Sequence, residues 1–239
     1  MNTMIITGAS SGLGKCLAEH FAAEGWTVCA VARSSDKLKA LAGAYPGNVF
    51  AYPADVSDAK QVKASFAAIE HDHGPVDVLI NNAGIVPQDK VFGKDDFEVI
   101  DQTIDTNLKG TMYCTYAVLP SMLERKDGRI INIASRAGVV GGAGRADPDE
   151  PLDFGDYGAS KFGVVGFGHH LGRRLLPRGI LMTTLCPGGI NTPVADAWDV
   201  DKSELMQPEQ IADLIEFLLK QEKNIFFKQM LFFAGFEWH

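Results

Sequence analysis

Near the start of the chain, Met4-Ile5-Ile6-Thr7-Gly8-Ala9-Ser10-Ser11-Gly12-Leu13-Gly14 combines three local signals. Its first four residues form a short apolar run of the kind that makes a buried strand. The glycines that follow make a flexible turn, because glycine tolerates backbone angles that other residues avoid. A helical pattern comes next, with apolar residues on one face at Leu17, Ala18, Phe21 and Ala22. A strand, a glycine-rich turn and a helix predict the first βα unit of an α/β fold.

The same alternation of apolar runs and amphipathic stretches continues to the end of the chain. Further strands are predicted at residues 27–32, 49–54, 76–80, 129–134, 180–185 and 230–233. Helices are predicted at residues 36–44, from a cap at Ser57 or Asp58, at 95–125, at 157–176 and from Pro208 to Lys220. Pro120 is expected to end or bend the third of these. We therefore expect one α/β domain over residues 1–239, with a doubly wound parallel sheet of about seven strands and helices on both faces.

Composition and net charge argue against some classes of binding partner. The chain has 239 residues, of which 46% are hydrophobic and 22% charged, as in globular proteins. A formal net charge of -8 argues against nucleic acid and anionic membrane surfaces as partners. No apolar run is long enough to span a bilayer, and a strand at Met4 leaves no room for a signal peptide. Cysteines Cys16, Cys29, Cys114 and Cys186 lack metal-ligand spacing. We expect a cytoplasmic protein with reduced cysteines and no metal.

The glycine-rich turn lies where α/β folds bind phosphate groups. Glycines let the backbone approach a pyrophosphate, and the helix N-terminus offers unpaired N–H groups and a favourable dipole. The hydroxyl groups of Ser10 and Ser11 suit phosphate oxygens. The spacing Gly-x-x-x-Gly-x-Gly differs from the usual dinucleotide fingerprint, Gly-x-Gly-x-x-Gly. A turn with no ligand therefore stays an open alternative.

The end of the second predicted strand carries Arg33 and Ser34, with no carboxylate before Asp36. In dinucleotide folds this position contacts the adenosine ribose, where an acidic residue favours NAD and an arginine accommodates the 2′-phosphate of NADP. A guanidinium group binds phosphate in a bidentate manner. The sequence therefore predicts NADP in preference to NAD. The alternative is an arginine that only faces solvent.

Tyr157 and Lys161 lie four residues apart and share one face of a helix. A free tyrosine has a pKa of about 10, so it exchanges protons poorly near neutral pH. A nearby ammonium favours the phenolate and brings that pKa closer to neutrality. The pair alone occurs by chance on many helices, so its meaning depends on the motifs around it.

Six motifs in order resemble the classical short-chain dehydrogenase/reductase family over nearly the whole chain. They are Thr7-Gly8-x-x-x-Gly12-x-Gly14, Asn81-Asn82-Ala83-Gly84, Asn107, Ser135, Tyr157-x-x-x-Lys161 and Pro187-Gly188-x-x-x-Thr192. The resemblance implies a Rossmann-type fold that holds NAD(P) at the carboxyl ends of its strands. It also implies a homodimer or homotetramer.

The resemblance implies a role for each matched residue. Tyr157 would exchange the proton with the substrate oxygen, and Lys161 would lower the pKa of Tyr157 and bind the nicotinamide ribose. Ser135 would stabilise charge on the substrate oxygen. Asn107 would support a proton relay behind Lys161, or else satisfy buried backbone groups. The implied cofactor contacts are Gly8, Ser10, Ser11, Gly12, Leu13, Gly14, Arg33, Ser34, Asp55, Val56, Asn82, Ala83, Gly84, Tyr157, Lys161, Pro187, Gly188, Ile190 and Thr192.

Together these features predict an NADP-dependent oxidoreductase that interconverts a small-molecule carbonyl compound and an alcohol by hydride transfer. One alternative is a cofactor-binding regulatory protein without catalysis, although such proteins usually lose the tyrosine or the lysine. Another is a lyase or isomerase on the same scaffold.

Two segments depart from the family pattern. Ser135 and Tyr157 are 22 residues apart rather than about a dozen, so residues 136–156 form an extended loop. Its acidic residues, Asp147, Asp149, Glu150, Asp153 and Asp156, predict either a substrate-selectivity loop or a solvated excursion. Residues 193–207 form a short segment in place of a longer helical lid, which suggests an open or shallow pocket. Apolar residues concentrated in the last fifteen positions favour an oligomer.

Overall fold

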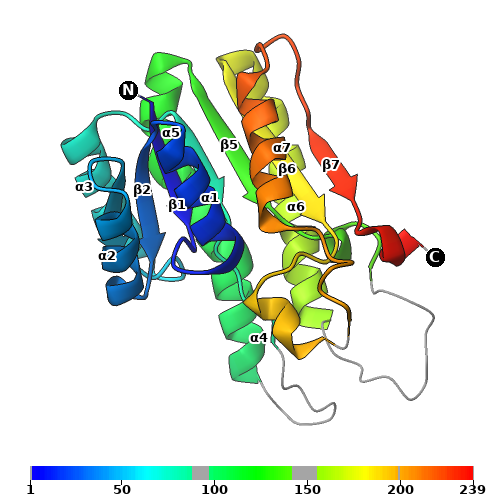
Figure 1. The fold of residues 1–239 in the computed structure, drawn as a ribbon. Coiled ribbons are helices and arrows are strands. Elements are labelled where there is room, and N and C mark those ends of the chain that lie inside the picture. Colours follow the sequence, from blue (N-terminus) through cyan, green and yellow to red (C-terminus); the bar gives the residue numbers. More distant parts are fainter. Residues whose placement is uncertain (1, 88–96, 142–154, 199, 239) are drawn as a thin grey trace.

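The computed structural model describes residues 2–87, 97–141, 155–198 and 200–238. Seven parallel strands form one sheet in the order β3-β2-β1-β4-β5-β6-β7 (Figure 1). Their bounds are β1 Thr3–Thr7, β2 Thr27–Ala32, β3 Val49–Pro53, β4 Val78–Asn81, β5 Gly128–Ile133, β6 Ile180–Pro187 and β7 Gln229–Phe232. The predicted α/β architecture with a doubly wound parallel sheet is confirmed.

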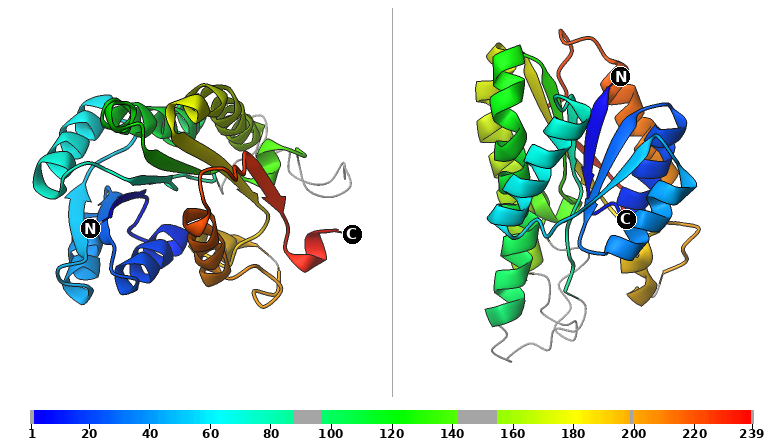
Figure 2. Two further views of the ribbon diagram at one scale, coloured as in Figure 1. Left: turned by 90° about the horizontal axis from the view of Figure 1, so that it is seen from above. Right: turned by 90° about the vertical axis from the view of Figure 1, so that its left-hand side faces the viewer.

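Helices cover both faces of the sheet (Figure 2). One layer contains α1 Gly12–Ala23, α2 Ser35–Ala44 and α7 Pro208–Lys220. The other contains α3 Ala59–His73, α5 Gly110–Arg125 and α6 Gly155–Leu175. Helix α4, Phe97–Ile104, continues through a π-helical turn, Asp105–Lys109, into α5 and extends beyond the carboxyl ends of the strands (Figure 1). Among the described residues, no helix combines the length and apolar character needed to cross a membrane.

Strand β1 shows why its sequence is apolar at every position. Met4, Ile5 and Ile6 are all fully buried. Successive side chains of a strand point to opposite faces. Met4 and Ile6 accordingly pack in the core under α1, α2 and α7, whereas Ile5 packs in the core under α3, α5 and α6. A strand that is covered on both faces has no polar side, so its signal in the sequence is an unbroken apolar run.

Most predicted elements lie within two residues of their observed bounds, and one of the two outcomes expected at Pro120 is excluded. Pro120 does not end its helix, because α5 continues through it to Arg125. Proline removes one backbone N–H and leaves the carbonyl four residues earlier, at Tyr116, without its helical partner. Pro120 and Tyr116 are both exposed, so water can satisfy that carbonyl. The helix ends instead at Lys126, which adopts a left-handed conformation with φ 54°.

The segment after β6 is closed at its base by backbone contacts. Ile190 and Met206 form an isolated parallel bridge. The Asn191 N–H donates to Met206 O at 2.8 Å, and the Met206 N–H donates to Gly189 O at 3.1 Å. Between them lies a 3-10 turn, Pro193–Ala197. Met206, near the end of the predicted short lid at residues 193–207, therefore bonds back to the residues that follow β6, and the role of the segment as a lid stays a prediction.

Candidate active site

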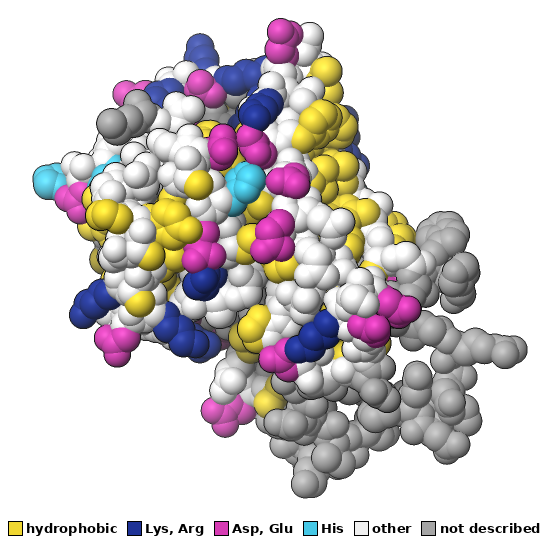
Figure 3. Space-filling view, viewed as in Figure 1, with side chains coloured by type: hydrophobic (Ala, Val, Ile, Leu, Met, Phe, Trp, Pro, Cys, Tyr) yellow, Lys and Arg dark blue, Asp and Glu magenta, His cyan; other side chains and the backbone are white. Residues whose placement is uncertain are grey.

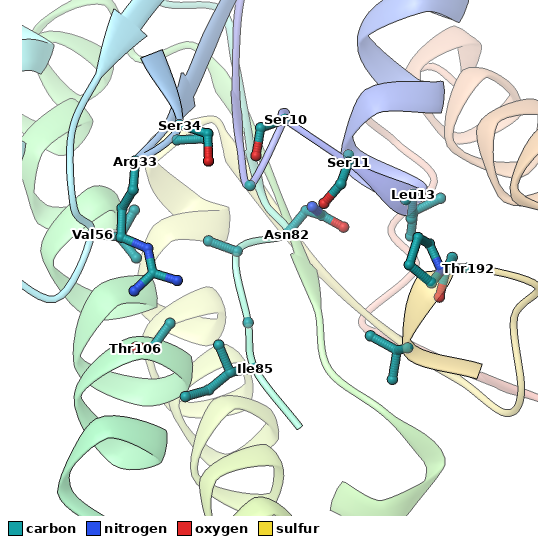
Figure 4. Close-up of a pocket in the computed structure, with 18 of the residues that line it drawn as sticks. Ser10, Ser11, Leu13, Arg33, Ser34, Val56, Asn82, Ile85, Thr106 and Thr192 are labelled. Atoms are coloured by element: carbon teal, nitrogen blue, oxygen red, sulfur yellow. The ribbon is translucent and has the colours of Figure 1, made fainter. Parts of the chain in front are cut away.

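The functional residues gather where the sheet order reverses, between β1 and β4. In open parallel sheets, ligands bind beyond the carboxyl ends of the strands at this point. A cavity of about 390 Å³ opens here (Figure 4). Of the predicted cofactor residues, those that line it are Gly8, Ser10, Ser11, Gly12, Leu13, Gly14, Arg33, Ser34, Asp55, Val56, Asn82, Ala83, Gly84, Ile190 and Thr192. Tyr157, Lys161, Pro187 and Gly188 lie outside its lining.

The turn after β1 is shaped by close backbone contacts. A Cβ atom on Gly14 would lie 2.3 Å from Gly8 O and 2.5 Å from Asn82 Nδ2. Gly8 itself has φ +70°, a region that favours glycine. The Asn82 side chain donates from Nδ2 to Thr7 O at 2.9 Å, which fixes the turn after β4 against the end of β1. The two turns therefore form one compact floor for the cavity.

The first residues of α1, Gly12, Leu13 and Gly14, line this cavity, and the N–H groups of a first helical turn have no partner within the helix. Ser11 occupies the N-cap position without a side-chain capping hydrogen bond, and the first turn has no acidic residue. Ser10 and Ser11 lie along the same edge of the cavity (Figure 4). A helix N-terminus with free donors and no competing carboxylate suits a phosphate group.

Arg33 is an exposed cation at the cavity wall. Its guanidinium group extends from the end of β2 past Val56 toward Thr106 (Figure 4). It forms no ion pair with any residue in the described part of the chain. Asp55 also lines the cavity, and its Oδ1 accepts hydrogen bonds from the Ser57 N–H and hydroxyl at 2.9 and 2.7 Å. The guanidinium group is therefore available to a ligand.

Asn107 lies in the π-helical turn and is buried. Its Oδ1 accepts from the Ile85 N–H at 2.8 Å, and its Nδ2 donates to Ile85 O at 2.9 Å and to Ser160 Oγ at 3.1 Å. These contacts satisfy the backbone of the segment after Gly84 and join it to α6. They support the predicted backbone role directly, and the relay role stays a prediction.

Lys161 is 5% exposed and lies behind the cavity. Its ammonium group donates to Ile133 O at 3.0 Å and lies 5.6 Å from the centroid of the Tyr157 ring. A Cβ atom on Gly84 would approach Nζ to 3.4 Å, so Gly84 forms the thin wall between Lys161 and the cavity. Burial lowers the pKa of Lys161 from 10.5 to about 8, because desolvation disfavours the charged form.

Burial raises the pKa of Tyr157, whereas a hydrogen bond from Ser135 and the positive charge of Arg136 lower it. Ser135 Oγ also accepts the Ala137 N–H at 3.1 Å, which orients the hydroxyl group at the start of the 3-10 turn Arg136–Gly138. The structure thus brings Ser135, Tyr157 and Lys161 close together. The cation that acts on the pKa of Tyr157 is Arg136, and the predicted effect of Lys161 stays a prediction.

Residues 2–203 match the short chain dehydrogenase family. The chain belongs to this family. It is 33% identical to the 3-oxoacyl-[acyl-carrier-protein] reductase FabG of Thermotoga maritima, over 97% of this chain and 95% of that one. This short-chain dehydrogenase is therefore an NAD(P)-dependent oxidoreductase that acts on C=O and CH–OH groups.

Two solved structures extend the comparison. A 3-ketoacyl-(acyl-carrier-protein) reductase from Brucella melitensis, complexed with NADH, superposes with a TM-score of 0.87 at 26% identity, covering 98% of this chain and 97% of that one. An actinorhodin polyketide ketoreductase variant with NADPH gives a TM-score of 0.84 at 30% identity, covering 100% and 98%. The cavity of this short-chain dehydrogenase fits such a cofactor, because the glycine floor, the α1 N-terminus and Arg33 match a dinucleotide's phosphates.

Several site residues of this short-chain dehydrogenase were not predicted. Lys37 and Thr106 line the cavity. Arg136 and Glu237 form an ion pair of 2.9 Å beside the Ser135 turn. Lys37 lies four residues after Arg33, a spacing that could have indicated a second cation. Glu237 carries no local signal, because the C-terminus and residue 136 meet only through the fold.

Part of the extended loop of this short-chain dehydrogenase cannot be compared with its prediction. Asp147, Asp149, Glu150 and Asp153 lie outside the described residues. Asp156 lies in the first turn of α6, directly before Tyr157. Elsewhere, His20, Asp213 and Glu216 place three potential ligand atoms within 4.8 Å of one another. Glu216 there already pairs with Lys220 and contacts His20 Nε2 at 3.0 Å, so protein side chains already engage this acidic group.

Proposed function

We propose that this short-chain dehydrogenase reduces a ketone of a small-molecule substrate with NADPH, using Tyr157 as the proton donor. The observation that carries the proposal is the hydrogen bond between Ser135 and Tyr157, beside the buried ammonium group of Lys161. Two hydroxyl groups that share one hydrogen bond can both address a single carbonyl oxygen. General acid catalysis of this kind contributes about 10²- to 10⁴-fold to a rate.

The cavity residues would hold the cofactor through complementary chemistry. The α1 N-terminus, Ser10 and Ser11 would bind the pyrophosphate, and Arg33 would bind the 2′-phosphate. Asp55 and Val56 would contact the adenine, while Ile190 and Thr192 would border the nicotinamide. When bound, the reduced nicotinamide supplies the hydride.

Tyr157 and its neighbours perform the proton chemistry. Ser135 donates a hydrogen bond to the substrate oxygen and stabilises the charge that develops there. Tyr157 transfers its phenolic proton to the same oxygen, and Lys161 stabilises the resulting phenolate. Burial raises the pKa of Tyr157, so the phenol carries its proton at neutral pH, while the hydrogen bond with Ser135 and the charge of Arg136 act in the opposite direction and ease proton transfer. Asn107 keeps α6 in place through Ser160.

The NADP preference rests on charge. Arg33 and Lys37 both line the cavity, and a 2′-phosphate adds negative charge where these cations lie. Two solved relatives contain NADPH or NADP, and a third contains NADH, so the family accommodates both cofactors. The names of the relatives favour 3-oxoacyl thioesters as the first substrates to test.

We also propose a homodimer or homotetramer. Phe217, Ile225 and Leu231 are 49%, 48% and 37% exposed. Hydrophobic side chains gather along the edge of the molecule near α7 and β7 (Figure 3). Tyr116 on α5 and Phe162 on α6 add a second exposed set on another face. Light scattering at micromolar concentration should give two or four chain masses, and a monomer would contradict the proposal.

The decisive experiment follows nicotinamide absorbance while ketones, aldehydes and 3-oxoacyl thioesters are offered with NADPH or NADH. We expect turnover of at least one ketone, faster with NADPH at equal concentration. Tight NADPH binding without turnover of any carbonyl or alcohol would instead favour a regulatory protein. Conversion without net oxidation of the cofactor would favour a lyase or isomerase.

A further inference from the structure

Glu237 is a buried carboxylate near the C-terminus. It lies in the 3-10 turn Gly235–Trp238 that follows β7, and its side chain is 7% exposed. Removing a carboxylate from water costs several kcal/mol unless charge and hydrogen bonds compensate. Here Oε1 pairs with Arg136 Nε at 2.9 Å, and Oε2 accepts the N–H groups of Gly189 and Ala234, both at 2.9 Å. Both oxygens of the carboxylate are therefore engaged.

The backbone after β6 is shaped around this carboxylate. A Cβ atom on Gly188 would lie 1.9 Å from Glu237 Oε2, so any side chain there would displace the carboxylate. A Cβ atom on Gly189 would lie 2.7 Å from Leu205 Cδ2 and 3.7 Å from Glu237 Oε1. Gly188 thus leaves the space that the Glu237 side chain fills, and Gly189 leaves the space that the Leu205 side chain fills.

Glu237 connects two loops that belong to the reaction site. Arg136 directly follows Ser135, so the ion pair holds the turn that carries the Ser135 hydroxyl group. Gly189 lies one residue before Ile190 and three before Thr192, which line the cofactor cavity. The positive charge of Arg136 also acts on Tyr157. One side chain therefore joins the proton-handling side of the site to the cofactor side.

We propose that Glu237 is a positioning residue for hydride transfer, which aligns the Ser135 turn with the segment from Gly188 to Thr192. The inference rests on the proposed function, because the alignment matters only if both sides act on one substrate. A misplacement of about 1 Å between reacting groups can cost about 100-fold in rate. A bond between the two loops at their bases is suited to prevent such a displacement.

The first test replaces Glu237 by glutamine, which keeps the shape of the side chain and removes its charge. We expect kcat to fall about tenfold, with the Kd for NADPH changed less than threefold. Amide hydrogen exchange should become about tenfold faster in peptides covering residues 186–192 and 135–141. Glu222→Gln is the matched control, because Glu222 is an exposed carboxylate in the same C-terminal part of the chain. It should change none of these quantities.

The second test is a double-mutant cycle with Arg136→Lys, which keeps the positive charge that acts on Tyr157 and removes the Nε group that pairs with Glu237. If Glu237 acts through Arg136 on the Ser135 turn, the second substitution should reduce kcat by less than twofold in the background of the first. Effects on kcat that multiply independently would overturn the proposal. A lower Tm with unchanged kcat and unchanged exchange would also overturn it and leave Glu237 as a structural contact alone.

Two further measurements keep the proposal testable. If Glu237→Gln does not fold, Glu237→Asp retains the charge but shortens the side chain, and the same loss of kcat with NADPH affinity retained is expected. Amide hydrogen exchange needs no substrate, so it tests the role of Glu237 independently of the proposed reductase function. If Glu237→Gln speeds exchange in both loops but the parent protein reduces no carbonyl compound, the proposed function is refuted and the connection between the loops is not. Unchanged exchange in Glu237→Gln would refute the connection.

Discussion

The cofactor cavity and the proton-handling centre lie next to each other but are held in place by different means. Around the cavity, Gly8 and Gly14 set the backbone shape and Arg33 extends from the wall without an ion pair to the described residues. Around Tyr157, by contrast, Asn107, Lys161 and Glu237 are buried and bound to atoms from distant parts of the chain. Gly84 is the point where the two regions touch.

This difference means that the two regions should affect different quantities, namely cofactor affinity and the rate of turnover. A site made by backbone shape offers donors that need no side-chain ordering, so its residues chiefly determine cofactor affinity. A site made by buried side chains fixes a geometry that matters at the transition state, so its residues chiefly determine kcat. Substitutions on the two sides should therefore have distinct kinetic signatures.

The largest effect is expected from Tyr157→Phe, which removes the proton donor and keeps the ring. Reduction should slow by about 10²- to 10⁴-fold, while the Kd for NADPH, measured by fluorescence, should change less than threefold. Equal losses in turnover and in cofactor binding would show that the two regions are not separable. Tyr45→Phe, the same substitution at a tyrosine outside the cavity lining, is the control.

Arg33→Asp tests the cavity side. A charge-assisted hydrogen bond contributes about 1.5–3 kcal/mol, so affinity for NADPH should fall about 10- to 100-fold relative to NADH. Saturating NADPH should restore kcat, because Tyr157 is untouched. Lys39→Asp makes the same reversal of charge on the exposed side of α2, outside the cavity lining, and should leave the ratio unchanged. A similar loss for both cofactors in Arg33→Asp would remove the role at the 2′-phosphate.

Gly14→Ala tests whether backbone shape forms the cavity floor. The new methyl group would meet Gly8 O at 2.3 Å, and backbone cannot yield as a side chain does. We expect a loss of about 1–3 kcal/mol in unfolding free energy and weaker NADPH binding. Gly43→Ala, at an open helical position with nothing within 4 Å, should be neutral or should stabilise by up to about 1 kcal/mol. Denaturant titration measures the unfolding free energy of both variants and shows whether only Gly14→Ala is destabilised.

The smallest effect is expected for the contribution of Lys161 to the pH dependence of stability. Its pKa is about 8 in the folded protein and 10.5 ordinarily, so between these values the unfolded chain binds more protons. Stability attributable to Lys161 therefore rises with pH through this window. Lys161→Met should unfold at higher temperature than the parent below pH 8, by the equivalent of about 1 kcal/mol, and this advantage should shrink toward pH 10. A pH-independent difference would contradict the burial argument.

The same contrast explains what the sequence could predict. The turn from Gly8 to Gly14 and the strand β1 are local, so their composition revealed both fold and cavity. Contacts between distant segments left no such pattern. No local pattern marks Arg136 as a site residue, although it adjoins Ser135. Glu237 has no local pattern either, because only the pairing of β6 with β7 brings it close to Arg136. The sequence could not show that the helix continues through Pro120, because solvent exposure, which depends on tertiary packing, decides the free-energy cost of a proline there.

The bridge between Ile190 and Met206 closes a loop, and the part of this loop that follows the cavity-lining residues Thr192, Pro193 and Val194 is an exchangeable segment. Two backbone hydrogen bonds close its base at 2.8 and 3.1 Å, and Asn191 Nδ2 adds a third contact to Gln207 Oε1 at 3.0 Å. Loop-closure entropy grows slowly with length, at about 0.6 kcal/mol for each doubling. A longer lid could therefore be grafted between Val194 and Met206 while the sheet keeps its register, so that substrate range and fold stability could be engineered independently.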